Sequence, residues 1–185
     1  MRKVSFTMNI SIDGYCDHDL GSPTEELMDY FTARMNDVDL LCYGRKMYGM
    51  MFPYWADVAR DNSGTPAELR FAKRLLEIDK MVFSSTLDQV APDTRLVRGD
   101  AVAELSRLKR EPGGEISIDS ISMLPELVGA GLIDEFHLVV HPVLAGRGRL
   151  LLPAGSLGKV QALRLVDTIR FQSGCLAFHY LKVEE

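Results

Sequence analysis

The sequence has little of what marks secreted, membrane-spanning or nucleic-acid-binding proteins. Only three of its 185 residues are cysteines (Cys16, Cys42 and Cys175), an odd number set far apart, so we expect free thiols rather than a disulfide framework. No window reaches the roughly 18 apolar residues that a membrane-spanning helix needs, and the short, interrupted apolar stretch at the N-terminus is not typical of a secretory signal. These absences predict a cytoplasmic protein with no membrane partner.

The chain also lacks positive charge. Its formal net charge of -5 argues against the broadly basic surface of a general nucleic-acid-binding protein, so no nucleic-acid partner is expected. An apolar fraction of 46% and a charged fraction of 25% are typical of globular proteins, and 185 residues suffice for one domain with a sizeable core. Because there is neither an internal repeat nor a low-complexity linker, the sequence predicts a single domain over residues 1–185.

Segments rich in β-formers alternate with segments of helical periodicity. Strands are expected at KVSFTMNI, VDLLCY, KMVFSST, TRLVRG, EISID and DEFHLVVHPVL. The tail LRLVDTIRFQSGCLAFHYLKV is expected to form two long strands joined at Ser173-Gly174. This pattern predicts an α/β fold in which a mostly parallel sheet carries helices on both faces and an antiparallel C-terminal hairpin at one edge.

Capping signals predict where several helices begin. The stretches Ser22 to Glu25 and Thr65 to Glu68 both read as capping boxes with proline at the first helical position. A later short helix is expected to end near Gly129 or Gly131. Proline is tolerated only in the first turn, so Pro125 makes Ser122 the expected N-cap of that helix.

Three joins follow predicted strands, at the edge of the sheet where ligands usually bind in such folds. Gly44-Arg45-Lys46 is either an anion site at a helix N-terminus or a glycine turn with two solvated cations. The hydroxyls of Ser84-Ser85-Thr86 have two interpretations. They either cap a helix or form a turn, or they hydrogen-bond to a ribose or phosphate. Asp119-Ser120 offers an acid that is a catalytic group, a cap or a turn residue.

Metal and nucleotide fingerprints are missing from the sequence. His137 and His141 would lie roughly 13 Å apart on one regular strand, too far to share a metal. Cys16 and His18 have no second ligand pair, so no metal site is expected. The motifs G-x-G-x-x-G, G-x-x-x-x-G-K-[ST] and G-x-S-x-G are absent. The loop GRGR (146–149) is either a turn or a phosphate contact.

Several motifs together carry a family resemblance. SIDGY, YGRKMYG, VFSST, GLIDEFHLVVHPVLAGRGRLLL and the final FQSGCLAFHY occur in this order along essentially the whole chain. The chain resembles the dihydrofolate-reductase-like superfamily, in the branch that contains the reductase domain of bacterial riboflavin biosynthesis. The resemblance implies a three-layer α/β fold, NADPH lying across the strand ends, a small-molecule substrate and a homodimer.

The resemblance also implies roles for particular residues. The cofactor phosphates, ribose and nicotinamide would be held by Gly44, Arg45, Lys46, Ser84, Ser85, Thr86, Asp119 and Ser120. Substrate would lie between the first strand, the first helix and the nicotinamide, and its candidate neighbours are Asn9, Asp13, Tyr15, Tyr30 and Trp55. Asp13 or Asp119 would deliver a proton, although each also has a plain explanation as a turn residue.

Three positions depart from the family pattern. Relatives usually carry Gly-Gly or Gly-Ser where this chain has Asp119-Ser120, and Met47 replaces a common threonine. Leu27 stands four residues before Phe31, where folate reductases carry a carboxylate, so folate is not the expected substrate.

The sequence therefore predicts an NADPH-dependent reductase. It would transfer a hydride to the C=N bond of a small pteridine- or pyrimidine-like heterocycle, resembling 5-amino-6-(5-phosphoribosylamino)uracil reductase. The alternatives are a non-catalytic small-ligand-binding protein with weakened NADPH binding, or a purely oligomeric use of the same fold.

Overall fold

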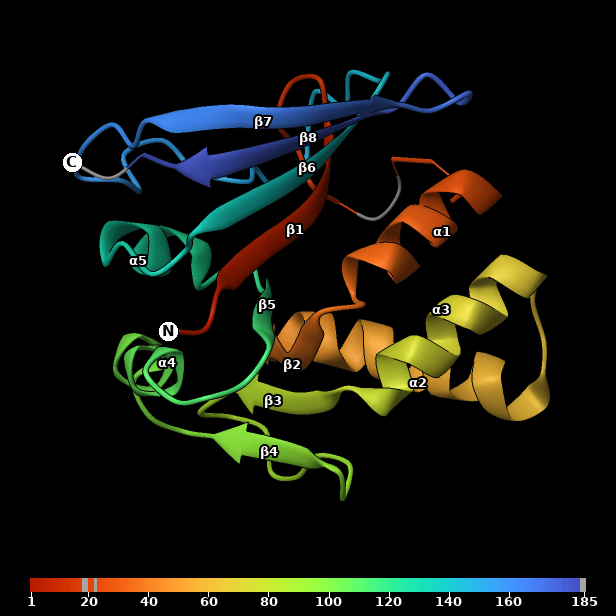
Figure 1. The fold of residues 1–185 in the computed structure, drawn as a ribbon, viewed down its shortest axis with the longest axis horizontal. Coiled ribbons are helices and arrows are strands. Elements are labelled where there is room, and N and C mark those ends of the chain that lie inside the picture. The colour runs from red at the N-terminus through yellow and green to blue at the C-terminus, as the bar shows by residue number, and fades with distance from the viewer. Residues whose placement is uncertain (18–19, 22, 184–185) are drawn as a thin grey trace.

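A central sheet of eight strands organises the protein, and the computed structural model describes residues 1–17, 20–21 and 23–183 (Figure 1). The strand order is β4-β3-β2-β5-β1-β6-β8-β7. The first six strands in this order pair in parallel, whereas β8 pairs antiparallel with both β6 and β7. The strands are β1 (Val4–Ser11), β2 (Val38–Gly44), β3 (Asp79–Phe83), β4 (Thr94–Val97), β5 (Glu115–Asp119), β6 (Glu135–His141), β7 (Leu163–Arg170) and β8 (Leu176–Lys182).

Helices cover both faces of this sheet, which confirms the predicted three-layer α/β architecture (Figure 1). One face packs against α1, α2 and α3, and the opposite face packs against α4 and α5. The helices are α1 (Glu25–Arg34), α2 (Arg45–Asp61), α3 (Pro66–Glu77), α4 (Ala101–Lys109) and α5 (Leu124–Gly129). None of the described helices is both long and apolar enough to cross a membrane.

The central strand β1 shows how the sheet separates its two faces. Val4 and Phe6 are fully buried in the apolar cluster that includes α4 and α5. The alternating residues Ser5 and Thr7 point to the other face, because successive side chains of a strand alternate. At β1, one face of the sheet therefore belongs to an apolar core, and the other carries polar groups beneath α1.

The helix starts were predicted with mixed success. Thr65 and Glu68 form the expected capping box, with Thr65 N donating to Glu68 Oε2 at 2.8 Å. The prediction for the first helix was wrong at its start: Thr24 is the N-cap and its Oγ1 accepts from Leu27 N at 3.4 Å, so Pro23 precedes the helix. Ser22 lies outside the described residues.

The N-cap predicted for α5 was also wrong. Met123 occupies that position and provides no side-chain cap, because Ser122 belongs to the preceding turn, where its Oγ lies 3.2 Å from Ser120 Oγ. Pro125 does lie in the first turn, and the helix ends at Gly129, as expected.

The C-terminal hairpin forms as predicted. Gly174 has a φ of 86° in the turn between β7 and β8, a left-handed conformation that favours glycine. Within the sheet β8 lies inside and β7 forms the edge. The three cysteines are buried and unbridged, which confirms the expectation of free thiols.

Candidate functional site

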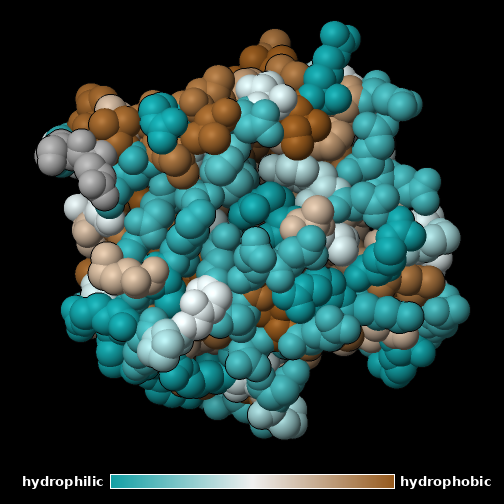
Figure 2. Space-filling view, in the orientation of Figure 1, coloured by the Kyte–Doolittle hydropathy of each residue, from teal (hydrophilic) through white to brown (hydrophobic). Residues whose placement is uncertain are grey.

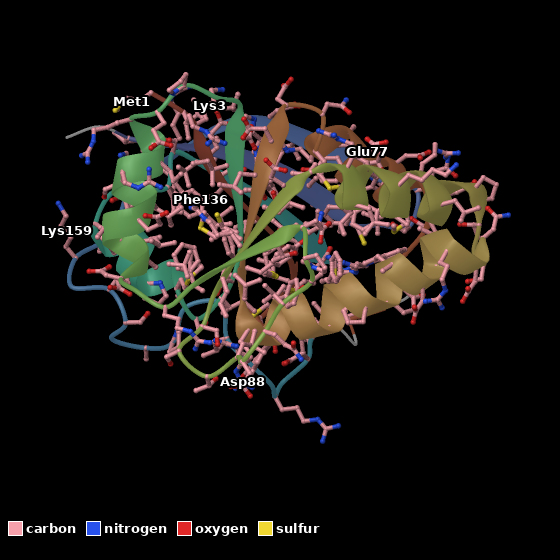
Figure 3. The ribbon with its side chains drawn as sticks, turned by 90° about the horizontal axis from the view of Figure 1, so that it is seen from below. Met1, Lys3, Glu77, Asp88, Phe136 and Lys159 are labelled. Carbon is pink, nitrogen blue, oxygen red and sulfur yellow. The ribbon has the colours of Figure 1, made fainter. Side chains whose placement is uncertain are left out.

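A cavity of about 240 Å³ lies between the sheet and helices α1, α2 and α3. Apolar side chains from the three helices line one side of it, among them Leu27, Phe31, Met51 and Trp55. Figure 3, a view from below, shows side chains filling the layer between the sheet and helices α2 and α3. An apolar wall of this kind facing a strand surface is typical of a small-molecule site.

The floor of the cavity is polar. Alternate residues of two adjacent strands line it, namely Ser5, Thr7 and Asn9 of β1 and Glu115, Ser117 and Asp119 of β5. Of these residues, only Asn9 and Asp119 were predicted from the sequence to belong to the site. The signal was present, since polar residues recur at every second position in strands otherwise expected to be buried.

A charged pair lies at the inner end of this floor. Arg34 Nη2 of α1 is 3.0 Å from Glu115 Oε1, and the same oxygen accepts from Ser5 Oγ at 2.5 Å. The Glu115 side chain is 8% exposed, so its charge needs this partner. Within the described residues, the buried Arg34 Nε has no hydrogen-bond partner. The lining of the cavity therefore includes a paired carboxylate and a guanidinium group with one buried, unused N–H donor.

His141, at the end of β6, also lines the cavity. Its Nε2 lies 2.9 Å from Asn9 Oδ1 and its Nδ1 lies 3.5 Å from Cys175 Sγ. Burial lowers the pKa of His141, so the ring is neutral at pH 7. This cluster fixes the amide of Asn9, a residue that the sequence analysis placed near the substrate.

Asp119 is an acidic group in the lining of the cavity whose pKa lies near neutral pH. It ends β5 directly beside Tyr43 of β2, and burial raises the pKa of its carboxyl to about 7. No hydrogen bond stabilises the ionised form among the described residues. Asp119 therefore holds a proton near neutral pH, as a general acid requires.

The cavity reaches the start of α2. Tyr43 and Met47 line it, and between them Gly44 caps the helix without a side-chain hydrogen bond. Arg45 and Lys46 follow, exposed, and neither makes an ion pair within the described part of the chain. Open N–H groups and two available cations are the features of an anion site.

Glycine is required at position 44 because Ser120 packs closely against it, not because of its backbone angles. Its φ is -82°, but a Cβ there would lie 2.5 Å from Ser120 Oγ and 3.4 Å from Ser122 Oγ. The turn after β5 thus packs directly against the start of α2. The first and third predicted joins are neighbours in space.

The second join forms a turn, because β3 is followed by a loop rather than a helix. Ser84 Oγ accepts from the N–H groups of Thr86 and Leu87 at 3.2 and 3.0 Å. Arg98 donates to the carbonyls of Ser85 and Leu87, at 3.3 and 2.6 Å, and holds this loop in place. The side chains of Ser85 and Thr86 are left exposed.

Asp13 serves a different purpose from Asp119. Its carboxylate accepts from Ser11 Oγ at 2.6 Å and from the backbone N–H groups of Ala145 and Gly146 at 3.0 and 2.7 Å. These hydrogen bonds lower the pKa of Asp13 to about 2, so the group is ionised at neutral pH. The geometry favours the turn role for Asp13, outside the lining of the cavity.

The GRGR loop is a turn held against residues 13–17. Asp17 Oδ2 accepts from Arg149 N at 2.6 Å, and the positive φ values of Gly146 and Gly148 shape the loop. A Cβ on Gly148 would collide with the Asp17 carboxylate at 1.8 Å. The cationic side chains of the loop therefore sit on a fixed backbone.

The four predicted substrate neighbours other than Asp13 divide into two groups. Asn9 and Trp55 line the cavity. Tyr15 instead forms a β-bridge with Leu150, and Tyr30 packs edge-on against Phe171 with ring centroids 5.5 Å apart. The two tyrosines lie outside the lining of the cavity.

Comparison with known proteins places this site in a family context. The family model described as the RibD C-terminal domain matches residues 2–177. The uncharacterized protein YyaP of Bacillus subtilis (strain 168) is 27% identical over 183 residues, which cover 97% of this chain and 94% of YyaP.

Solved structures share the fold at lower sequence identity. A protein provisionally called a riboflavin biosynthesis protein, from Shewanella sp. PV-4, superposes with a TM-score of 0.74 at 21% identity and full coverage of both chains. Dihydrofolate reductase from Enterococcus faecalis, in complex with NADP(H) and RAB-propyl, gives a TM-score of 0.63 at 12% identity, covering 98% of this chain and 97% of the reductase. These likenesses confirm the dihydrofolate-reductase-like fold.

Proposed function

Because this chain belongs to the family of RibD C-terminal domains, we propose that it is an NADPH-dependent reductase acting on the C=N bond of a small pteridine- or pyrimidine-like heterocycle. One observation carries the proposal: a cavity with a proton-holding carboxyl, Asp119, reaches the N-terminus of α2. A reductase needs its cofactor and its substrate to meet at one place, and this edge of the sheet brings both regions together.

The residues at the strand ends fit a dinucleotide phosphate. The open start of α2 with Arg45 and Lys46 would hold the cofactor phosphates, and the exposed hydroxyls of Ser85 and Thr86 would contact the adenosine ribose and its 2′-phosphate. Asp119 is compatible with a nearby phosphate when protonated, since the neutral acid adds no repulsion. NADPH is favoured over NADH because its 2′-phosphate would contact these hydroxyls and give Arg45 and Lys46 a second anionic partner.

The cavity suits a flat polar ring rather than folate. Leu27 occupies the α1 position of the folate-binding carboxylate, but Glu115 supplies a buried carboxylate from β5 instead. Glu115 and Arg34 present acceptors and a donor, which match the alternating donors and acceptors of pyrimidine and pteridine edges. A volume of about 240 Å³ limits the ligand to a small ring system.

The proposed chemistry divides between cofactor and protein. When bound, NADPH supplies the hydride that adds to the carbon of the C=N bond. The protein orients the ring, excludes water with the apolar wall of α1 and α2, and delivers a proton to the nitrogen. Asp119 is the proton source in this proposal, because a pKa of about 7 keeps about half of the carboxyl population protonated at neutral pH and able to release the proton.

A thermal titration with NADPH and NADH tests the proposal. At a hundredfold excess over the dissociation constant, bound cofactor stabilises the protein by about 2.7 kcal/mol. We expect a higher melting temperature with NADPH than with NADH, and we expect Arg45→Ala to remove most of that difference. Arg60→Ala is the matched control, since Arg60 lies at the other end of α2 and pairs with Asp57 and Asp61. No shift with either nucleotide would refute NADPH dependence.

A second candidate function is a small-ligand-binding protein without redox chemistry. The observation in its favour is Asp119, which stands where the resemblance implies a glycine and whose ionised carboxylate would repel a nearby pyrophosphate. On this reading ligands fill the cavity and raise the melting temperature, while no acceptor causes NADPH absorbance to fall. Recovery of NADPH binding in Asp119→Gly would identify the aspartate as the obstruction.

We also propose that the protein is a cytoplasmic homodimer. All eight residues of the edge strand β7 are exposed, including the apolar Leu165, Val166 and Ile169. Figure 2 shows hydrophobic side chains gathered along the top of the molecule, where β7 lies in Figure 1. Light scattering of the purified protein tests this: a dimer mass that Leu165→Lys reduces to a monomer supports pairing through β7, and a monomeric wild-type protein refutes it.

A further inference from the structure

Three metal-ligating side chains gather on β6 and β8, outside the lining of the cavity. Glu135 and His137 lie two residues apart on β6 and so point to the same face, whereas Phe136 between them, labelled in Figure 3, points to the α4 side. His179 of β8 is directly paired with His137 across the antiparallel ladder. Two neighbouring strands therefore fix all three side chains.

The ligand atoms of this cluster converge on one point. Glu135 Oε2 lies 2.8 Å from His179 Nε2 and 3.5 Å from His137 Nε2. One ligand atom from each of the three residues lies within 4.8 Å of the others. Tetrahedral zinc, with bonds of about 2.0–2.1 Å, separates its ligand atoms by about 3.3 Å. Shifts of well under 1 Å would bring the two oxygen–nitrogen distances to that value.

His137 provides a second, independent observation. The residue is 3% exposed, and its Nε2 has no hydrogen-bond partner among the described residues. Buried polar atoms are nearly always satisfied, so an unpaired ring nitrogen aimed into a carboxylate and a second imidazole needs an explanation. A bound cation supplies one, because it accepts the lone pair of the neutral ring.

The surroundings leave the cluster accessible. The His179 side chain is 27% exposed and provides an entry path from solvent. Lys3 binds the other carboxylate oxygen, Glu135 Oε1, at 2.7 Å, which leaves Oε2 directed at the histidines. The Lys3 side chain is 67% exposed, so its charge is well screened, and the charge of Arg34 is offset by Glu115.

We propose that Glu135, His137 and His179 bind a divalent transition-metal ion of the zinc class, with one coordination position left for water or another ligand. Two imidazoles and a carboxylate are a donor set that suits Zn²⁺. The inference revises the sequence-based expectation of no metal site, which compared His137 with His141 on the same strand and did not consider His179 of the neighbouring strand. It does not depend on the reductase proposal, because no residue of the cluster lines the cavity.

Titration of the chelator-treated full-length protein with Zn²⁺ and Co²⁺ tests the proposal. We expect one equivalent of Zn²⁺ by calorimetry and the visible absorption bands of four-coordinate Co²⁺. His179→Phe keeps the aromatic stack on His137, whose ring centroid is 4.1 Å away, but removes the ligand nitrogen, so we expect affinity to fall at least tenfold. His141→Ala is the control, because His141 lies on β6 with His137 but outside the cluster, and this substitution should leave the Zn²⁺ affinity unchanged.

Lys3→Ala provides a test with the opposite sign. Removing the ammonium group that competes for Glu135 is expected to tighten Zn²⁺ binding several-fold, while a role of the cluster in hydrogen bonding alone predicts no effect on metal affinity. The proposal is overturned if no saturable binding occurs at one equivalent, if His179→Phe binds Zn²⁺ as tightly as the wild type, or if His141→Ala weakens binding equally.

Discussion

Replacing Asp119 with asparagine is expected to stabilise the protein, and the gain is expected to grow between pH 4 and pH 7. In the wild type the carboxyl ends β5 in a buried setting that disfavours its ionised form. Asparagine has nearly the same shape and carries no charge at any pH. The substitution therefore removes the ionisation and leaves the packing beside Tyr43 largely intact.

The sign and the size follow from the two pKa values. The pKa of Asp119 is about 7 in the folded protein and near 3.8 in an unfolded chain, so the folded state binds its proton more tightly. Between these values unfolding releases a proton, and the free energy of unfolding falls by about 1.4 kcal/mol for each pH unit. The full loss is at most about 4 kcal/mol, reached above pH 7, and partial exposure of the side chain reduces it to about 3 kcal/mol.

Urea unfolding at several pH values between 4 and 8 measures this effect, with the fluorescence of the single, buried Trp55 as the probe. The quantity of interest is the difference in unfolding free energy between Asp119→Asn and the wild type, in which other titrating groups cancel. Asp13→Asn is the control, because a pKa of about 2 makes its effect constant above pH 5. If the difference in unfolding free energy between Asp119→Asn and the wild type stays constant from pH 4 to 8, the carboxyl of Asp119 has an ordinary pKa and the reasoning is refuted.

Two further substitutions probe the packing around the site. Gly44→Ala is expected to cost about 1–3 kcal/mol because its Cβ would lie 2.5 Å from Ser120 Oγ, and adding Ser120→Gly should recover most of that loss in the same urea assay. Glu115→Gln is expected to cost about 2 kcal/mol, less than for a fully buried pair because the Arg34 side chain is 26% exposed, and a loss below 0.5 kcal/mol would show that the pair is solvated.

The sequence was sufficient for the fold because its local signals agree with one another. Strand composition, helical periodicity and the capping box at Thr65 all describe one alternating chain, and the sheet realises that alternation. Helix starts were less predictable because several hydroxyl residues compete for one cap. Thr24 shows this, since it caps α1 although Ser22 was the predicted N-cap. At α5 the cause differs, because Met123 occupies the N-cap position and no side chain caps that helix.

The candidate site was harder to predict because it is assembled across strands. The start of α2 was visible as a local motif, but the Arg34–Glu115 pair joins residues 81 positions apart. The pairing of His137 with His179 likewise depends on the register between β6 and β8, which no single strand encodes. The alternation of polar residues in β1 and β5 was a readable signal for the floor of the cavity, and it went unused.

Under the reductase proposal, one ionisation of Asp119 would affect both cofactor binding and proton delivery. The protonated acid is neutral, so it does not repel a nearby phosphate, and it has a proton to donate. The ionised form repels the phosphate and has no proton to donate. Under the reductase proposal, NADPH affinity and turnover should therefore both decline as the pH rises through about 7. Asp119→Asn separates the two effects: NADPH affinity should lose its pH dependence over this range, while turnover falls at every pH. Equal turnover by the variant and the wild type would remove Asp119 from the proton path and leave its place to solvent.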